Sequence, residues 1–106
     1  MDKLVTIYTS VDSKEKAFEI ARKLLCDRLC ACVNIFPLQS LYWWEGKIEV
    51  ADECGIFIKT RKSIYKKTVE KLKEIHPYSV PMIIVYEAEF VFDKYMDWLI
   101  KETSNE

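Results

Sequence analysis

The chain has 106 residues, 50% of them hydrophobic and 31% charged, and a formal net charge of −1. This predicts one folded domain over residues 1–106, and the near-neutral charge argues against a dominant nucleic-acid or anionic-membrane surface. No apolar run approaches the roughly 20 residues of a membrane span, and the first residues, MDKLVTIYTS, do not resemble a signal peptide, so we expect a cytoplasmic protein.

The first two predicted elements are a strand and a helix. A β-rich run at residues 3–9 predicts the strand. Asp12, followed three residues later by Glu15, forms a capping-box pattern. The apolar positions that follow recur at helical spacing to about Leu29, which predicts a helix there.

Next comes a long hairpin. One strand is predicted from Ala31 to about Trp44, with a turn at residues 45–46, and a second strand ends near Thr60. Pro37 has no N–H to donate, which predicts an edge position or a bulge in the first strand. Residues 50–53 interrupt the apolar pattern, which predicts a bend in the second strand.

The remaining elements are a helix, a short strand and a last helix. Ser63 is predicted to cap the helix, whose apolar face extends to Ile75. The segment 76–81 holds two prolines and predicts a break. A strand is predicted over residues 82–88, and apolar residues at helical spacing over 92–99 predict the last helix.

This order of elements predicts an α+β, ferredoxin-like fold, a split βαβ sandwich with a long hairpin and an added C-terminal helix. Both helices of the βαββαβ core should pack on one face of the sheet. The other face should stay open and partly apolar, which indicates a partner surface.

The hairpin strands are about twice the usual five or six residues, so a chain this small cannot pair them along their length. Unpaired strand backbone promotes association unless something covers it. The sequence therefore predicts an obligate assembly, with Trp43 as an interface anchor.

Five segments in order resemble the CutA divalent-cation-tolerance family, and the match covers essentially the whole chain. They are ACVN at 31–34, YWWEGKI at 42–48, Glu53 before IKT at 58–60, HPYSVP at 76–81 and YMDWL at 95–99. The resemblance implies a ferredoxin-like subunit, a homotrimer whose long strands pair between chains, and a role in tolerance to divalent metals, chiefly copper. It implies no known enzyme activity.

The resemblance also implies where copper ligands occur in some members, but the corresponding positions here are Tyr8, Ile75 and His76. Only His76 can ligate as those members do. Imidazole is a common metal ligand, and thiolates favour copper(I) or zinc, so the predicted metal site combines His76 with Cys32 and Glu53. The alternatives are a turn role for His76, in which its ring caps the preceding helix, and simple burial for Cys32.

A small ligand is the other predicted occupant, with Trp44, Lys59 and Tyr78 as its binding residues. The predicted site lies in clefts between subunits and binds a divalent metal such as copper or a small ligand. Interface packing for Trp44, and an ion pair of Lys59 with Glu53 or another partner, are the alternatives. The lysines of the second helix are interpreted as a solvated face.

A second hypothesis is an RNA-recognition module, which has the same core order of elements. Residues 53–58 faintly echo its third-strand motif but lack the leading basic residue and the paired stacking aromatics. The first hypothesis therefore includes no nucleic-acid partner. One histidine, no serine–histidine arrangement and no paired-carboxylate cluster give little support to an enzyme. Four cysteines without an export signal are interpreted as thiols.

Overall fold

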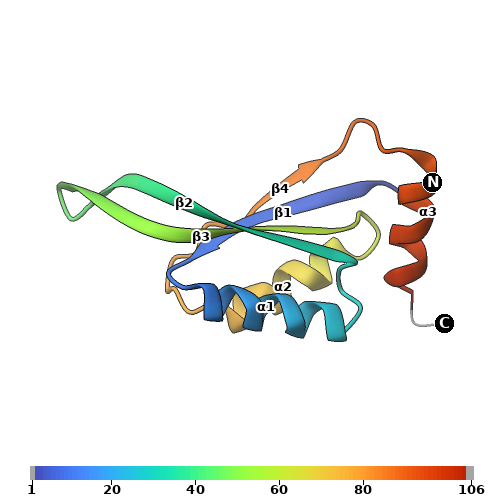
Figure 1. Ribbon diagram of the computed structural model, residues 1–106, viewed down its shortest axis with the longest axis horizontal. Helices are drawn as coiled ribbons and strands as arrows, with labels where there is room; N and C mark the ends of the chain where they lie inside the picture. Colours follow the sequence, from blue (N-terminus) through green and yellow to red (C-terminus); the bar gives the residue numbers. More distant parts are fainter. Residues whose placement is uncertain (1, 105–106) are drawn as a thin grey trace.

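The computed structural model of the protein describes residues 2–104. Its sheet has the order β2-β3-β1-β4, with every neighbouring pair antiparallel. The strands are β1 Leu4–Val11, β2 Cys32–Trp44, β3 Lys47–Arg61 and β4 Ile84–Glu87. The helices are α1 Lys14–Cys26, α2 Tyr65–Ile75 and α3 Asp93–Glu102. This arrangement confirms the predicted α+β ferredoxin-like fold with an added C-terminal helix (Figure 1).

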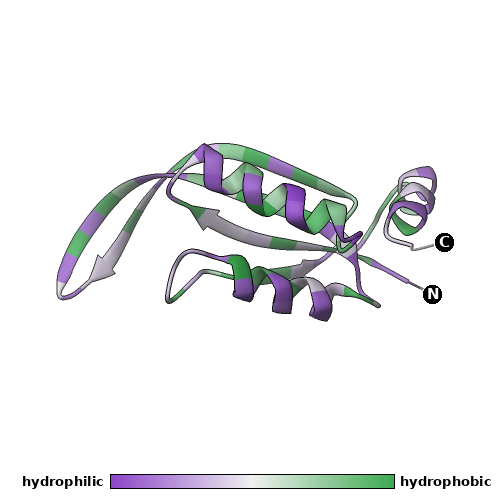
Figure 2. Cartoon of the chain, turned by 90° about the horizontal axis from the view of Figure 1, so that it is seen from below, coloured by the Kyte–Doolittle hydropathy of each residue, from purple (hydrophilic) through white to green (hydrophobic). Residues whose placement is uncertain are grey.

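Helices α1 and α2 lie on the same face of the sheet (Figure 1). Side chains alternate along a strand, so β1 and β3 send every second residue toward these helices. Figure 2 shows hydrophilic and hydrophobic bands alternating along the helices, as expected of helices with one buried face. The resulting core consists of Ile7, Val11, Ala17, Ile20, Leu24, Cys30, Ile56, Ile58 and Leu72.

The opposite face of the sheet carries an aromatic cluster. The ring of Phe57 lies 5.2 Å from that of Tyr8 and 4.9 Å from that of Phe36, measured between centroids. Beside them Gly55 is buried, and a Cβ atom built there would overlap the Phe36 ring and come within 2.7 Å of Leu38. A glycine is therefore required at this position by close packing.

We expect Gly55→Ala to lower the free energy of unfolding by about 1–3 kcal/mol, because the added methyl group must displace the Phe36 ring. Urea unfolding checks this. Gly46→Ala is an informative comparison, since nothing lies within 4 Å of a Cβ there and its cost comes only from its φ of +79°. Unchanged stability in Gly55→Ala would contradict the packing argument.

The hairpin extends well beyond the rest of the sheet (Figure 1). Strand β1 ends at Val11, opposite Cys54, so residues 38–44 and 47–53 pair only with each other. The pairing of β2 with β3 is continuous from Cys32–Lys59 to the turn, one residue opposite one throughout, so the bend predicted at 50–53 is not made by a bulge. The polar side chains do not disturb the backbone pairing there, because both faces of this two-stranded segment are open.

The turn at the hairpin tip is as predicted. Glu45 and Gly46 both have positive φ, +50° and +79°, which matches a two-residue turn between strongly twisted strands. Pro37 lies on β2, an edge strand of the sheet, as predicted. An edge strand has one side without a strand partner, so a residue that has no N–H to donate is tolerated there.

The predicted limits of α1 are wrong at both ends. The Ser13 side chain, not Asp12, caps α1 by accepting from the Lys16 N–H, while Asp12 forms an ion pair with the Lys16 ammonium. Helix α1 also ends at Cys26 rather than Leu29, because Arg28 adopts a left-handed backbone with φ of +57°.

The predicted N-cap of α2, Ser63, is also wrong, because Ser63 bonds to a distant residue instead of to the helix. The residue before the helix is Ile64, which makes no side-chain cap, and Ser63 instead donates its N–H and hydroxyl to the Asp2 carboxylate. Strand β4 is shorter than the predicted 82–88, because only residues 84–87 pair with β1.

Candidate functional site

His76 follows α2 and meets the edge of β1 just beyond β4. Strand β4 pairs with β1 only as far as Tyr8, which leaves the next part of that edge without a strand neighbour. There the His76 Nε2 atom lies 3.0 Å from the Ser10 carbonyl oxygen and 3.0 Å from the Thr9 hydroxyl oxygen. The imidazole therefore takes the place of a further strand residue along β1.

These partners define the tautomer of the ring. The Tyr78 N–H donates to Nδ1 at 3.1 Å, so Nδ1 is an acceptor. A carbonyl only accepts, so Nε2 carries the proton, and the ring is neutral. His76 is the C-cap of α2 through its backbone N–H, which donates to the Leu72 carbonyl. Its ring bonds to Thr9, Ser10 and Tyr78 instead, so the turn role is confirmed and capping by the ring is wrong. His76 is only 8% exposed, and burial lowers its pKa, although the Ser10 bond and Glu53 act in the opposite direction.

Tyr78 extends from this turn to the second strand of the hairpin. Its hydroxyl donates to Glu53 Oε2 at 3.0 Å, and the Ser10 hydroxyl approaches the same oxygen at 3.4 Å. Burial, together with the Glu53 carboxylate, raises the pKa of Tyr78 well above its ordinary value. The phenol is therefore neutral and acts as a donor to a carboxylate.

The structure thus brings together three of the predicted site residues, His76, Glu53 and Tyr78. It adds Thr9 and Ser10, which the sequence did not indicate. The only sequence clue to these two is that hydroxyl residues end a strand otherwise rich in apolar side chains.

Cys32 and Lys59 lie at another place on the sheet. They face each other across β2 and β3, six residues along β3 from Glu53, or roughly 20 Å at about 3.3 Å per residue. Tyr95 of α3 lies beside this pair, with the Lys59 ammonium 5.8 Å from its ring centroid. Burial, reinforced by Cys32, raises the pKa of Tyr95.

Trp44 occupies a third place, at the exposed hairpin tip. It faces Lys47, six residues along β3 on the other side of Glu53, again roughly 20 Å away. The six predicted residues therefore lie at three separate places along the length of the hairpin of one chain. They can form one site only if a neighbouring chain brings these places together, and a site between subunits stays a prediction.

A complete metal site within one chain does not fit the described residues. Among residues 2–104, no three His, Cys, Asp or Glu side chains are grouped so that they could hold a metal ion. Both nitrogens of His76 already have hydrogen-bond partners. A metal at His76 would have to replace one of these bonds and take its other ligands from Glu53, water or a second chain.

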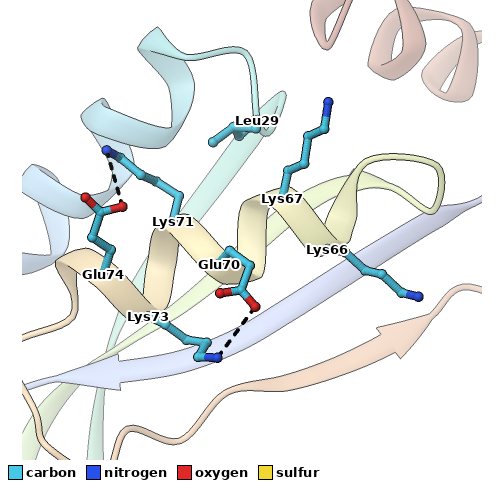
Figure 3. A pocket seen from close by; sticks show the side chains of 7 residues that line it. All are labelled: Leu29, Lys66, Lys67, Glu70, Lys71, Lys73 and Glu74. Carbon is cyan, nitrogen blue, oxygen red and sulfur yellow. Dashed lines mark ion pairs between the residues drawn. The ribbon is translucent and has the colours of Figure 1, made fainter.

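The lysines of α2 line a surface hollow of about 790 Å³. Figure 3 shows Lys66 and Lys67 pointing away from each other, whereas Lys71 and Lys73 are paired with acids of the same helix. The pairs are Lys71–Glu74 at 4.0 Å and Lys73–Glu70 at 3.5 Å. The positive charges do not converge on one point, which supports the interpretation as a solvated face.

All four cysteines are free thiols, and their environments differ. Burial, and to a smaller extent Cys32, raises the pKa of Cys30 to about 12, whereas Cys26 is exposed on α1. We expect iodoacetamide to modify Cys26 first and Cys30 last in the native protein. Peptide mass spectrometry over time measures the order, and rapid modification of Cys30 would contradict its burial.

The fold and this cluster define a class of small ferredoxin-like subunits with an over-long hairpin and a polar cluster at the edge of β1. No helix described by the structure is both long and apolar enough to cross a membrane. Residues 5–102 match the CutA1 divalent ion tolerance protein family. The chain belongs to that family, as the sequence resemblance predicted.

Individual relatives support the assignment. The chain is 41% identical over 100 residues to the divalent-cation tolerance protein CutA of Pyrococcus horikoshii, covering 94% of this chain and 98% of that one. It is also 41% identical over 96 residues to CutA of Thermotoga maritima, covering 91% and 95%. The crystal structure of the divalent ion tolerance protein CutA1 from Ehrlichia chaffeensis superimposes with a TM-score of 0.95 at 34% identity, covering 98% of each chain.

Proposed function

We propose that the protein is a homotrimeric, non-enzymatic divalent-cation tolerance protein that binds a divalent metal such as copper, or a small ligand, in clefts between its subunits. One observation carries the assembly: four large apolar side chains gather on one face of the part of the hairpin that extends beyond β1. They are Leu41, Trp43, Ile48 and Val50, all more than half exposed in the single chain. The number three comes from the resemblance to the family.

The proposed cleft contains the Glu53–Tyr78 pair and the His76 turn of one subunit. Cys32, Lys59 and Trp44 lie too far along the same hairpin to reach these groups, so a neighbouring subunit would have to supply them. A hairpin that projects beyond its own sheet can carry Trp44 to a neighbour. The match to the CutA1 family does not favour the RNA-recognition alternative.

Calorimetric titration of reduced, tag-free protein with Cu²⁺ and with Zn²⁺ tests the proposed site. We expect weak metal binding in the wild type, because few protein ligands are available, and weaker binding still in His76→Ala. Lys66→Ala is the matched control, because Lys66 lies on the solvated face of α2.

Equal metal affinities in the wild type and His76→Ala would remove His76 from the metal site. Failure of both metals to bind at all would leave the small-ligand form of the proposal. A stable monomer in sedimentation velocity at micromolar concentration would contradict the cleft itself, since no cleft between subunits would then exist.

A further inference from the structure

We infer that His76 is a positioning residue for Tyr78: its neutral imidazole fixes the turn after α2 so that the Tyr78 hydroxyl meets the Glu53 carboxylate. This role requires no metal. It concerns the same site as the proposed function and rests on that function for its biological meaning, although its geometry lies within one chain.

The first step is the anchoring of the imidazole to β1. The Nε2–H group donates to the Ser10 carbonyl at the part of the β1 edge that β4 leaves free. A buried carbonyl without a partner is costly, so this bond fixes the ring against the strand. The side chain of Thr9, fully buried, meets the same nitrogen and restricts the ring further.

The second step passes from the ring to the turn. With Nε2 held as the donor, Nδ1 is the acceptor, and it receives the backbone N–H of Tyr78. The ring planes of His76 and Tyr78 meet edge-on, with centroids 5.0 Å apart. A residue directly before Pro77 has few backbone conformations available, so the bond acts on a segment that is already stiff.

The third step is the outcome at Glu53. With its backbone N–H held by the imidazole, the Tyr78 side chain places its hydroxyl 3.0 Å from Glu53 Oε2. Ser10 contributes twice, since its carbonyl anchors the imidazole and its hydroxyl approaches the same carboxylate oxygen. Ser10 of β1 therefore contacts both the imidazole that holds the turn and the carboxylate that the Tyr78 hydroxyl meets.

Two conservative variants separate the halves of this role. In His76→Asn the amide oxygen can replace Nδ1 as the acceptor for the Tyr78 N–H. In His76→Gln the amide nitrogen can replace Nε2 as the donor to Ser10. We expect each variant to release Tyr78 in part, because Asn gives up the bond to the Ser10 carbonyl and Gln gives up the bond from the Tyr78 N–H.

The readout is the ¹³Cζ chemical shift of Tyr78 in protein with labelled tyrosine, assigned with Tyr78→Phe and recorded in the presence of a chelator. Glu53→Gln defines the shift of a phenol that has lost its carboxylate partner. We expect both His76→Gln and His76→Asn to move the signal toward that value, because each breaks one of the two bonds that hold the turn. An unchanged signal in His76→Gln would overturn the inference.

The wild-type protein provides a second test that needs no variant to fold. The chain has a single histidine, so a long-range ¹H–¹⁵N spectrum shows one imidazole. We expect the tautomer with the proton on Nε2, and a proton on Nδ1 would overturn the inference. Neither measurement involves added metal, so a failed metal titration and a failed positioning role remain distinguishable.

Discussion

Replacing Trp43 by aspartate is expected to convert the proposed homotrimer into monomers at micromolar concentration. Trp43 is 72% exposed in the single chain and faces Ile48 across the hairpin, with Leu41 and Val50 as the next pair on the same face. Each of these three is at least 60% exposed. Loss of an interface tryptophan commonly costs about 2 kcal/mol or more, roughly 30-fold in affinity, and a desolvated carboxylate adds to that cost.

Sedimentation velocity over a concentration series measures the effect, and Trp43→Ala should give a smaller loss in the same direction. Glu49→Gln is the matched control, because Glu49 lies on the same ribbon but points to the opposite face, beside Tyr42. An assembly of unchanged mass and stability in Trp43→Asp would show that the apolar face of the hairpin is not the interface.

The sequence predicted the hairpin well because its information is local and redundant. Alternating apolar residues, a turn with Gly46 and an edge position for Pro37 all indicate the same pairing. The caps were less predictable. Asp12 and Ser13 are adjacent and both suitable, and the choice depends on the backbone path after β1. Ser63 forms its bonds with Asp2, 61 residues away, which no local pattern reveals.

The candidate site was predictable only in part for a similar reason. His76 and Tyr78 attract attention as the sole histidine and an aromatic residue in a proline-rich turn, and Glu53 is a polar residue in a long strand. Their meeting with Ser10 depends on how far β4 extends along β1, and this register follows from tertiary packing. Sequence spacing likewise could not show that Lys59 lies beside Tyr95 and far from Glu53.

The pH dependence of stability should report directly on His76. Burial lowers its pKa in the folded protein below the ordinary value of about 6.5, so the unfolded chain binds more protons as the pH falls below that value. Stability is therefore fully present above about pH 6.5 and is lost as the pH falls through the folded-state pKa. One proton bounds the slope at about 1.4 kcal/mol per pH unit.

Urea unfolding from pH 7.5 to pH 5, at fixed protein concentration and with a chelator, measures this dependence. We expect the free energy of unfolding to fall in the wild type and to stay nearly flat in His76→Asn, which has no imidazole to protonate. The lowered pKa values of Asp2 and Glu87 fall below this range, so these carboxylates stay ionised in both proteins. Since a protonated Nδ1 cannot accept the Tyr78 N–H, equal pH dependence in the two proteins would mean that acid does not act through the His76 turn.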